Sequence, residues 1–373
     1  MGVASALDLE KDEKVEKITL MDNHQPNLEK ALGRAKTEKI DIIKADATDR
    51  STVDLMKKYE VGVGALPHPA SAPALRNAIR AGLSVVDMVY EEEQLELDED
   101  AKKADVTIIP GFGVHPGIAN VFAGQAYSKL DKTIKVIIRC GGLPQNPNSA
   151  LHHKTAFNIN SALGEYAKKV KVIENGKLKI MEPLSEPEKI QHPELGDIEC
   201  FLTNTASTLL KTLGDVKELK SKTVRWPGNL DRMKLLMDCG LLRMEEVEVT
   251  GVKMRPLDVF ATLIKPKMTL EEGEKELTYL EVEVEGTQGS VLKRYKFELL
   301  DYYDEKEELT SMSRTTGFPP AIAARMIVSG QITQKGIVPS EKIFIGDNFE
   351  FLMKELAQRG ISVKITESSI RIT

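Results

Sequence analysis

The chain has 373 residues, of which 41% are hydrophobic and 29% charged, and this length favours two domains over a single core. The formal net charge of −6 argues against a nucleic-acid or acidic-membrane partner, which would favour a basic stripe. The three cysteines, Cys140, Cys200 and Cys239, show no metal-ligand spacing and are typical of reduced cytoplasmic thiols. No run approaches the roughly 20 apolar residues of a membrane span, and no signal-peptide core is present. We therefore expect a cytoplasmic, two-domain protein without a metal site.

The first hundred residues alternate short apolar strands with amphipathic helices. The pattern predicts strands at 17–21, 41–43, 61–66, 83–89 and 106–109, and helices at 27–36, 51–59 and 72–81. Strands separated by helices at this pitch form right-handed βαβ units. The sequence therefore predicts an α/β fold with a Rossmann-type, doubly wound parallel sheet.

This sheet has an unusual beginning. Residues 1–9 have the pattern of the helix that follows a Gly-x-Gly-x-x-Gly turn, yet no strand precedes them. Asp22 lies 20 residues after Gly2, which is the spacing of the acid that binds the ribose in such folds. We interpret Gly2 as the third glycine of the fingerprint and expect the first strand to be missing, because a start codon was assigned too late. The alternative is an ordinary surface helix without a nucleotide site.

Candidate cofactor contacts lie at the ends of the predicted strands, where open parallel sheets bind nucleotides. They are Gly2, Asp22, Asp46, Thr48, Gly64, Leu66 and Pro67. A glycine such as Gly64 lets a ribose or nicotinamide approach the backbone, although close helix–strand packing is an equal alternative. A loop acid such as Asp46 is often only solvated. No Arg or Lys directly follows Asp22 to meet a 2′-phosphate, so NAD is favoured over NADP.

The second half has a less regular pattern of hairpins and crossing helices. Helices are expected at 117–129, 162–168, 205–213, 230–239, 319–328 and 349–359, and strands at 133–140, 170–173, 177–181, 277–285 and 291–300. Asn175-Gly176 is a strong hairpin turn, and the last two strands alternate with period two. We expect an NAD-binding domain at 1–112 and an α+β mixed-sheet substrate domain at 113–317. We expect the segment 318–373 to pack back on the first domain.

Four motifs resemble one known family. They are GFGVHPGIAN (Gly111–Asn120), GGLP (Gly141–Pro144), RWPG (Arg225–Gly228) and SMSRTTGFPP (Ser311–Pro320). In this order they resemble the saccharopine dehydrogenase superfamily, and most of all its lysine 6-dehydrogenase branch. The resemblance implies a Rossmann domain with an inserted mixed-sheet domain that carries the substrate site and the contact of a homodimer.

The resemblance implies NAD-dependent oxidative deamination of the lysine ε-amino group, which gives 2-aminoadipate 6-semialdehyde, NADH and ammonia. Asn120 and the Gly141–Pro144 loop resemble the lysine branch, whereas His115 and the segment Thr155–Asn160 depart from it. The amine substrate therefore stays open. The alternatives are a saccharopine- or carboxynorspermidine-type enzyme and a non-catalytic nucleotide-binding relative.

Oxidative deamination needs a base, and a histidine that titrates near neutrality is the natural choice. His115, on the loop between the two halves, is the first candidate. The alternative is that His115 only packs at the hinge between the domains. His153, Lys154 and Glu165 are further catalytic candidates, against solvated positions at a strand end and on a helix surface.

Substrate binding needs groups that hold an amino-acid carboxylate, and a guanidinium fork suits this best. Arg225 and Arg314 lie in the resembling motifs and are the first candidates. The alternative is that they form interdomain or intersubunit ion pairs. Asn120 and Gly142 are further candidates for the substrate pocket.

Overall fold

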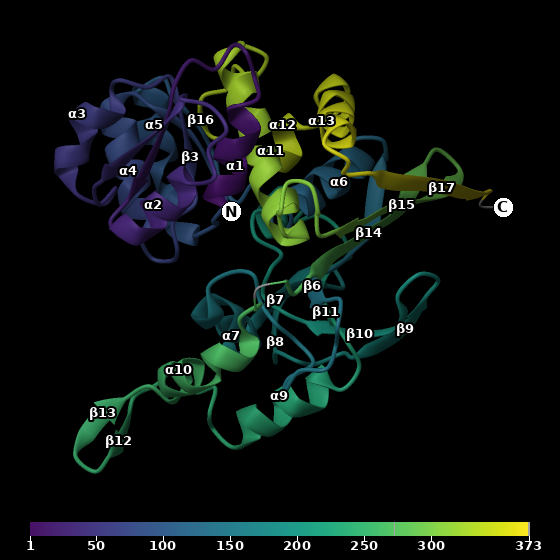
Figure 1. Cartoon of the computed structure of the whole chain (residues 1–373). Helices are drawn as coiled ribbons and strands as arrows, with labels where there is room; N and C mark the ends of the chain where they lie inside the picture. The colour runs from purple at the N-terminus through teal and green to yellow at the C-terminus, as the bar shows by residue number, and fades with distance from the viewer. Residues whose placement is uncertain (272, 372–373) are drawn as a thin grey trace. The chain divides into compact units, whose positions relative to one another are not determined.

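The computed structural model describes residues 1–271 and 273–371 (Figure 1). The chain forms two compact units, which we call unit 1 and unit 2. Unit 1 contains Met1–Val121 and Ser313–Arg359, and unit 2 contains Phe122–Met312 and the chain from Gly360. The division falls inside two helices, α6 (Ile118–Tyr127) and α11 (Ser311–Val328). Within the described ranges, no helix is long and apolar enough to cross a bilayer.

Unit 1 alternates strands and helices, as the sequence predicts. Its strands are β1 (Ile18–Asp22), β2 (Ile40–Lys44), β3 (Val61–Gly64), β4 (Ser84–Asp87), β5 (Thr107–Ile109) and β16 (Gly336–Ile337). Its helices, besides parts of α6 and α11, are α1 (Gly2–Leu9), α2 (Gln25–Leu32), α3 (Val53–Met56), α4 (Ser71–Ala81), α5 (Asp98–Lys103), α12 (Ser340–Ile343) and α13 (Asp347–Gln358), with 3₁₀ helices η1 (Arg50–Thr52) and η2 (Glu92–Leu97). The helix expected at 51–59 is shorter than predicted, because it begins as η1 and ends at Met56.

The parallel strands of unit 1 form two separate sheets. One pairs β1 with β2, and the other has the order β16-β5-β4-β3. In a doubly wound sheet the first strand lies between the strands that correspond to β1 and β3. The Rossmann-type sheet is therefore interrupted between β1 and β3.

Burial reflects this interruption. Every residue of β4 is buried, whereas every residue of β1 and of β3 is partly exposed. Helix α1 contacts both β1 and β3, and its residues Ala4–Asp8 are all buried. Residues 1–9 therefore do not form an exposed surface helix, and a nucleotide site beside them stays a prediction.

Unit 2 is built on a nine-stranded mixed sheet. Its strands are β6 (Lys132–Pro144), β7 (Val170–Glu174), β8 (Lys177–Met181), β9 (Glu188–His192), β10 (Gly196–Leu202), β11 (Glu218–Arg225), β14 (Glu276–Gln288), β15 (Val291–Tyr302) and β17 (Val363–Arg371). Its helices, besides parts of α6 and α11, are α7 (Ile159–Ala167), α8 (Leu209–Thr212), α9 (Asn229–Asp238) and α10 (Pro256–Met268), and a separate hairpin joins β12 (Val247–Val249) to β13 (Val252–Met254). The predicted hairpin across Asn175-Gly176 is confirmed.

The main path of this sheet is β17-β15-β14-β6-β11-β10-β9. Strand β6 is parallel to β11 and antiparallel to β14, with Glu276 opposite Pro144. The C-terminal segment differs from its expected course. Its residues 336–337 join the first unit as β16, but β17 adds to the second unit's sheet beside β15 (Figure 1). Helix α11 begins at Ser311 rather than at 319, with Pro319 and Pro320 inside it.

Candidate functional site

Three strands of unit 2 bring polar residues to one edge of its sheet. Strand β6 ends at Pro144 and the parallel strand β11 ends at Arg225, while the antiparallel strand β14 begins there with Glu276. Trp226, the residue after β11, donates from Nε1 to the Pro144 carbonyl at 2.7 Å. This bond ties the ends of β6 and β11 together.

A cavity of about 20 Å³ lies at this edge, which is room for about one water. Its wall consists of Gly142, His153, Lys154, Thr155, Ala156, Phe157, Arg225, Glu276 and Met312. Four of the predicted site residues, Gly142, His153, Lys154 and Arg225, therefore come together. They come from the ends of two strands and from the loop before α7.

Arg225 is buried and held in place by neutral groups. Its Nε donates to the Tyr166 hydroxyl at 2.7 Å, and its Nη1 donates to the Val224 carbonyl at 2.8 Å. The guanidinium also lies near the face of the Tyr166 ring, 5.7 Å from its centroid. No carboxylate within the described ranges forms an ion pair with it, although Glu165 on α7 is near enough to feel its charge. Arg225 therefore keeps a positive charge that an anionic ligand group can match.

His153 is 2% exposed, and neither ring nitrogen has a hydrogen-bond partner among the residues that the structure describes. Burial, aided by the charge of Arg225, lowers the pKa of His153 well below its usual value. The imidazole is therefore neutral at pH 7 and can accept a hydrogen bond from a ligand in the cavity. An unsatisfied buried imidazole is costly, which is typical of a functional position.

Glu276 is the acidic residue of the cavity wall. Its Oε1 accepts from the Met312 N–H at 2.9 Å, whereas Oε2 is buried without a hydrogen-bond partner in the described part of the chain. Burial raises the pKa of Glu276 to about 7, and the nearby carboxylate of Asp301 adds to this rise. Bonds from the start of α11 oppose it. This carboxyl group can exchange a proton near neutrality.

The other two catalytic candidates of unit 2 have partners. The Lys154 ammonium is bound by the Glu274 carboxylate at 2.5 and 2.6 Å, so its charge is already matched. Glu165 is half-buried. Its Oε1 lies 3.9 Å from the Lys168 ammonium, whereas its Oε2 is buried without a hydrogen-bond partner in the described ranges. Burial raises the pKa of Glu165, against the opposing charges of Lys168 and Arg225. Glu165 lies near Arg225 but is not part of the cavity wall.

Glycines at the end of β6 permit close packing. A Cβ on Gly141 would lie 2.2 Å from the Val224 carbonyl oxygen, which shows how closely β6 approaches β11. A Cβ on Gly142 would lie 2.6 Å from Cε of Met312. The Met312 methyl group therefore fills the space beside Gly142 and keeps the cavity small.

The remaining catalytic and substrate candidates lie in unit 1. Burial lowers the pKa of His115 to about 4, so the expected titration near neutrality is not found. Asn120 accepts from the Gly117 N–H at 3.3 Å and donates to Glu341 at 3.3 Å. Arg314 is buried and donates to the Arg359 carbonyl at 2.7 Å. None of the three is in the wall of the unit 2 cavity.

The cofactor candidates also lie in unit 1. Asp22 ends β1, and its Oδ1 accepts from the His24 N–H at 2.7 Å. Asp46 is exposed and closes a local turn by accepting from the Thr48 N–H and hydroxyl at 2.9 and 2.7 Å. Leu66 and Pro67 follow β3 in a loop.

Two glycines of unit 1 make room for other residues. A Cβ on Gly2 would lie 3.2 Å from Cβ of Ala65, and a Cβ on Gly64 would lie 2.9 Å from the Asp87 carboxyl group. These distances favour the packing alternative for Gly64, because the Asp87 side chain occupies the space beside it.

Asp87 is a further buried acid in unit 1, at the end of β4. Its carboxylate accepts from the Ser71 hydroxyl, from Gln94 at 3.0 Å and from the Val89 N–H at 3.0 Å. Burial nevertheless raises the pKa of Asp87 to about 6, and the nearby Glu91 charge contributes. The hydrogen bonds thus only partly compensate for the lost hydration.

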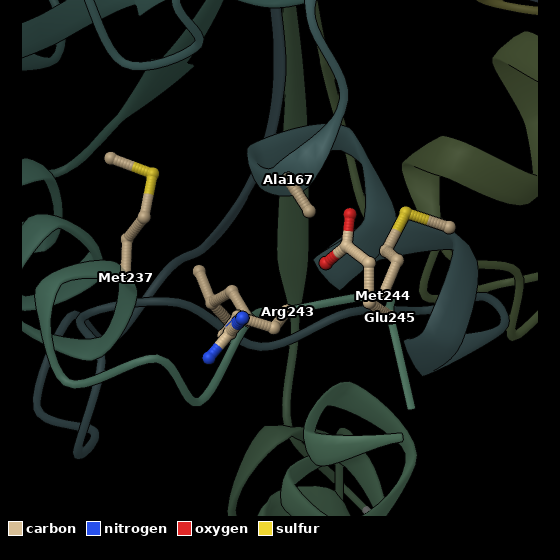
Figure 2. Close-up of a pocket in the computed structure, with 6 residues that line it drawn as sticks. Ala167, Met237, Arg243, Met244 and Glu245 are labelled. Atoms are coloured by element: carbon tan, nitrogen blue, oxygen red, sulfur yellow. The ribbon is translucent and has the colours of Figure 1, made fainter. Parts of the chain in front are cut away.

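A larger cavity of about 200 Å³ in unit 2 has a different character. Ala167, Met237, Leu242, Arg243, Met244 and Glu245 line it, and Figure 2 shows the thioether of Met244 beside the carboxylate of Glu245. It contains no buried acid or histidine, so we do not consider it the reaction site. Among the residues that the structure describes, no three His, Cys, Asp or Glu side chains cluster as metal ligands would.

Sequence reasoning did not identify Glu276, Tyr166 or Met312 as site residues. The only available signal for Glu276 was its place as an acid before an apolar, period-two strand. Its contact with the start of α11 joins residues 36 positions apart, which no local pattern reveals.

Two family models match successive parts of the chain. Residues 1–109 match the family model described as Saccharopine dehydrogenase NADP binding domain. Residues 113–361 match the model described as Saccharopine dehydrogenase C-terminal domain.

Two curated relatives illustrate the range of similar proteins. A saccharopine dehydrogenase [NADP(+), L-glutamate-forming] of Saccharomyces cerevisiae is 23% identical over 90% of this chain and 91% of its own. A carboxyaminopropylagmatine dehydrogenase of Synechocystis is 26% identical over 70% of this chain and 65% of its own. Among solved structures, apo saccharopine dehydrogenase (L-Glu forming) from S. cerevisiae has a TM-score of 0.80 at 19% identity and covers 99% of this chain and 98% of its own, which shows a shared fold.

Proposed function

Because the chain belongs to the saccharopine dehydrogenase family, we propose that it catalyses NAD(P)-linked exchange between an amino-acid-derived secondary amine and its amine and carbonyl components. In the oxidative direction, a C–H bond beside the amine nitrogen loses a hydride and the resulting imine is hydrolysed. In the reductive direction, an amine and an aldehyde condense and the imine is reduced. Saccharopine, which yields glutamate and 2-aminoadipate semialdehyde, is the first substrate to test.

The observation that carries the proposal is the cavity at the edge of the unit 2 sheet. Arg225 supplies a desolvated cation for a substrate carboxylate, and neutral His153 supplies a hydrogen-bond acceptor. Names of similar proteins support this class of substrate, since they include saccharopine dehydrogenases, a carboxyaminopropylagmatine dehydrogenase and a carboxynorspermidine synthase. Each of these names refers to an amino-acid derivative.

For the cofactor, unit 1 offers Asp22 at the end of β1 as the residue that would hold the adenosine ribose. A bound nicotinamide dinucleotide supplies the two-electron exchange. We propose NAD as the preferred form because a carboxylate at this position disfavours a 2′-phosphate. The matching family model is described as NADP binding, so both cofactors must be compared.

Ammonia-releasing oxidation of lysine is the second candidate. Gly142 of the cavity wall lies in the Gly141–Pro144 loop, which resembles the lysine 6-dehydrogenase branch. The two reactions differ in the second product, which is an amino acid in one case and ammonia in the other.

A steady-state assay tests the proposal. We expect NADH or NADPH to be consumed with 2-aminoadipate semialdehyde plus glutamate. Formation of NADH with lysine alone would instead indicate the second candidate. Arg225→Lys keeps the charge but loses the fork, so kcat/KM should fall roughly tenfold or more. Arg232→Lys on α9 is the matched control and should have little effect. No turnover of either substrate set with either cofactor would contradict the proposal.

A further inference from the structure

The wall of the unit 2 cavity contains one basic and one acidic side chain that lack an ionic partner in the described part of the chain. Arg225 forms no ion pair within the described ranges, and the same is true of Glu276, although both belong to the cavity wall. The other charged group of the wall, Lys154, is already bound by Glu274. His153 is neutral because burial lowers its pKa well below its usual value. A ligand therefore meets one cation and one carboxyl group that can ionise near neutrality.

Glu276 is held in a fixed position for binding. Its Oε1 accepts from the Met312 N–H at 2.9 Å at the start of α11, and this bond directs the carboxyl group. The side chain is 3% exposed, and Oε2 is buried without a hydrogen-bond partner in the described part of the chain. A buried carboxylate oxygen of this kind costs free energy unless a donor from a ligand satisfies it.

We propose that Glu276 binds the α-ammonium group of an amino-acid substrate whose carboxylate is held by Arg225. This inference rests on the proposed function, because it takes the cavity to be the amino-acid site, and it adds the residue that distinguishes an amino acid from a simple carboxylic acid. Separate cationic and anionic groups match the two charges of a zwitterion.

An amino acid fits this cavity only if one side chain of its wall moves. A volume of about 20 Å³ is too small for an amino acid. Met312 is the group that moves, since its Cε lies over Gly142 and a methionine side chain adapts easily. Its backbone N–H, which holds Glu276, need not move with the side chain.

The protonation state of Glu276 can be followed separately from ligand affinity. Its pKa is raised to about 7, first by burial and then by Asp301, against the bonds from Met312, Ser311 and Thr310. The other charged neighbours in the wall are Arg225 and the paired Lys154. An ammonium group bound to Glu276 stabilises the ionised carboxylate, so binding at pH 6 should release a proton.

The test uses matched ligands and the full chain. Trp226 is the sole tryptophan and lies next to Arg225, so its fluorescence reports on the cavity. L-lysine is compared with 6-aminohexanoate, and L-glutamate with glutarate, since each second ligand lacks only the α-amino group. In the wild type, the α-amino group should strengthen binding about tenfold or more. Glu276→Gln should remove this advantage and leave the affinity for glutarate within about twofold.

Controls separate this role from a general effect on folding. Glu245→Gln makes the same substitution in the other cavity and should keep the full α-amino advantage. Calorimetry of lysine binding to the wild type at pH 6, in two buffers of different ionisation enthalpy, should show release of up to about one proton. This measurement needs no variant, so it decides the question even where Glu276→Gln does not fold.

Three results would overturn the inference: equal binding of lysine and 6-aminohexanoate by the wild type, an unchanged α-amino advantage in Glu276→Gln, or no binding of any of the four ligands. These results are independent of turnover. If the α-amino group strengthens binding but no substrate is turned over, only the proposed function is contradicted. If substrate is turned over but the α-amino group does not strengthen binding, only the role of Glu276 is contradicted.

Discussion

Burial changes the chemistry of individual acids that look ordinary in the sequence. Glu276 and Asp87 both lie at strand ends, where sequence patterns favour solvated acids, yet they are 3% and 2% exposed. Both carry a raised pKa because the surrounding protein replaces water. The two differ in their partners, since Asp87 is bonded on both oxygens whereas Oε2 of Glu276 has no partner in the described ranges.

The raised pKa of Asp87 predicts a pH dependence of stability. The native state keeps the proton up to a pKa of about 6, whereas the unfolded chain loses it near 3.8. Between these values the native state binds more protons, so stability falls as pH rises. The free energy of unfolding should therefore fall by about 2 kcal/mol between pH 4 and pH 7 through this group alone. Urea denaturation of the wild type and Asp87→Asn at several pH values measures the difference.

The comparison with Asp87→Asn isolates this contribution from other titrating groups, which are common to both proteins. In Asp87→Asn, the fall in the free energy of unfolding between pH 4 and pH 7 should be smaller by the contribution of Asp87. Parallel curves for the two proteins across this pH range would show that Asp87 titrates at an ordinary pKa.

At this scale, candidate site residues could be chosen from the chemistry of their side chains, but the burial of those side chains could not be predicted. Arg225 and His153 were candidates because of their chemistry and motif positions, and both line the cavity. His115 was expected to titrate near neutrality, but burial lowers its pKa to about 4. The burial of a side chain depends on contacts between segments far apart in the sequence, so no local sequence pattern reveals it.

At the scale of elements, the two sheets of unit 1 should differ in local stability. Strand β1 pairs with β2 alone and is partly exposed throughout, whereas β4 is buried between β3 and β5. A sheet of two strands is marginally stable by itself. Amide hydrogens of residues 18–22 should therefore exchange roughly tenfold or more faster than those of residues 84–87.

Hydrogen exchange followed by mass spectrometry tests this difference, with peptides from β14 as a reference for a strand paired on both sides. Equal protection of β1 and β4 would mean that the two sheets open together as one unit.

The pattern of elements was largely predictable, because periods of two and 3.6 residues are local features. The strands that were predicted lie close to their observed positions. Seven observed strands were not predicted: β9, β10, β11, β12, β13, β16 and β17. The order β16-β5-β4-β3 and the pairing of β17 with β15 were not predictable in this way. They join segments more than two hundred and more than sixty residues apart, respectively.

At the scale of the whole molecule, the helices shared by the two units should couple their unfolding. Helix α6 has buried residues on both sides of the division, Ile118 and Val121 in unit 1 and Phe122 and Ala126 in unit 2. A helix of ten residues is not stable when half of its packing is lost. Unfolding followed by Trp226, which reports on unit 2, should therefore coincide with unfolding followed by circular dichroism, which reports on both units.

Urea titrations with both probes on one sample provide the measurement, and the two midpoints should agree within about 0.2 M, a small fraction of a transition width. A Trp226 transition separated from a second one seen only by circular dichroism would show that the units unfold independently.

The interruption between β1 and β3 has a consequence for the behaviour of the protein at high concentration. Within the described ranges each of these strands pairs on one side only, so backbone N–H and C=O groups line two open edges. Such an edge accepts any extended chain, because recognition is by the backbone and not by particular side chains. We therefore expect main-chain pairing at these two edges of unit 1 to contribute to self-association at high concentration.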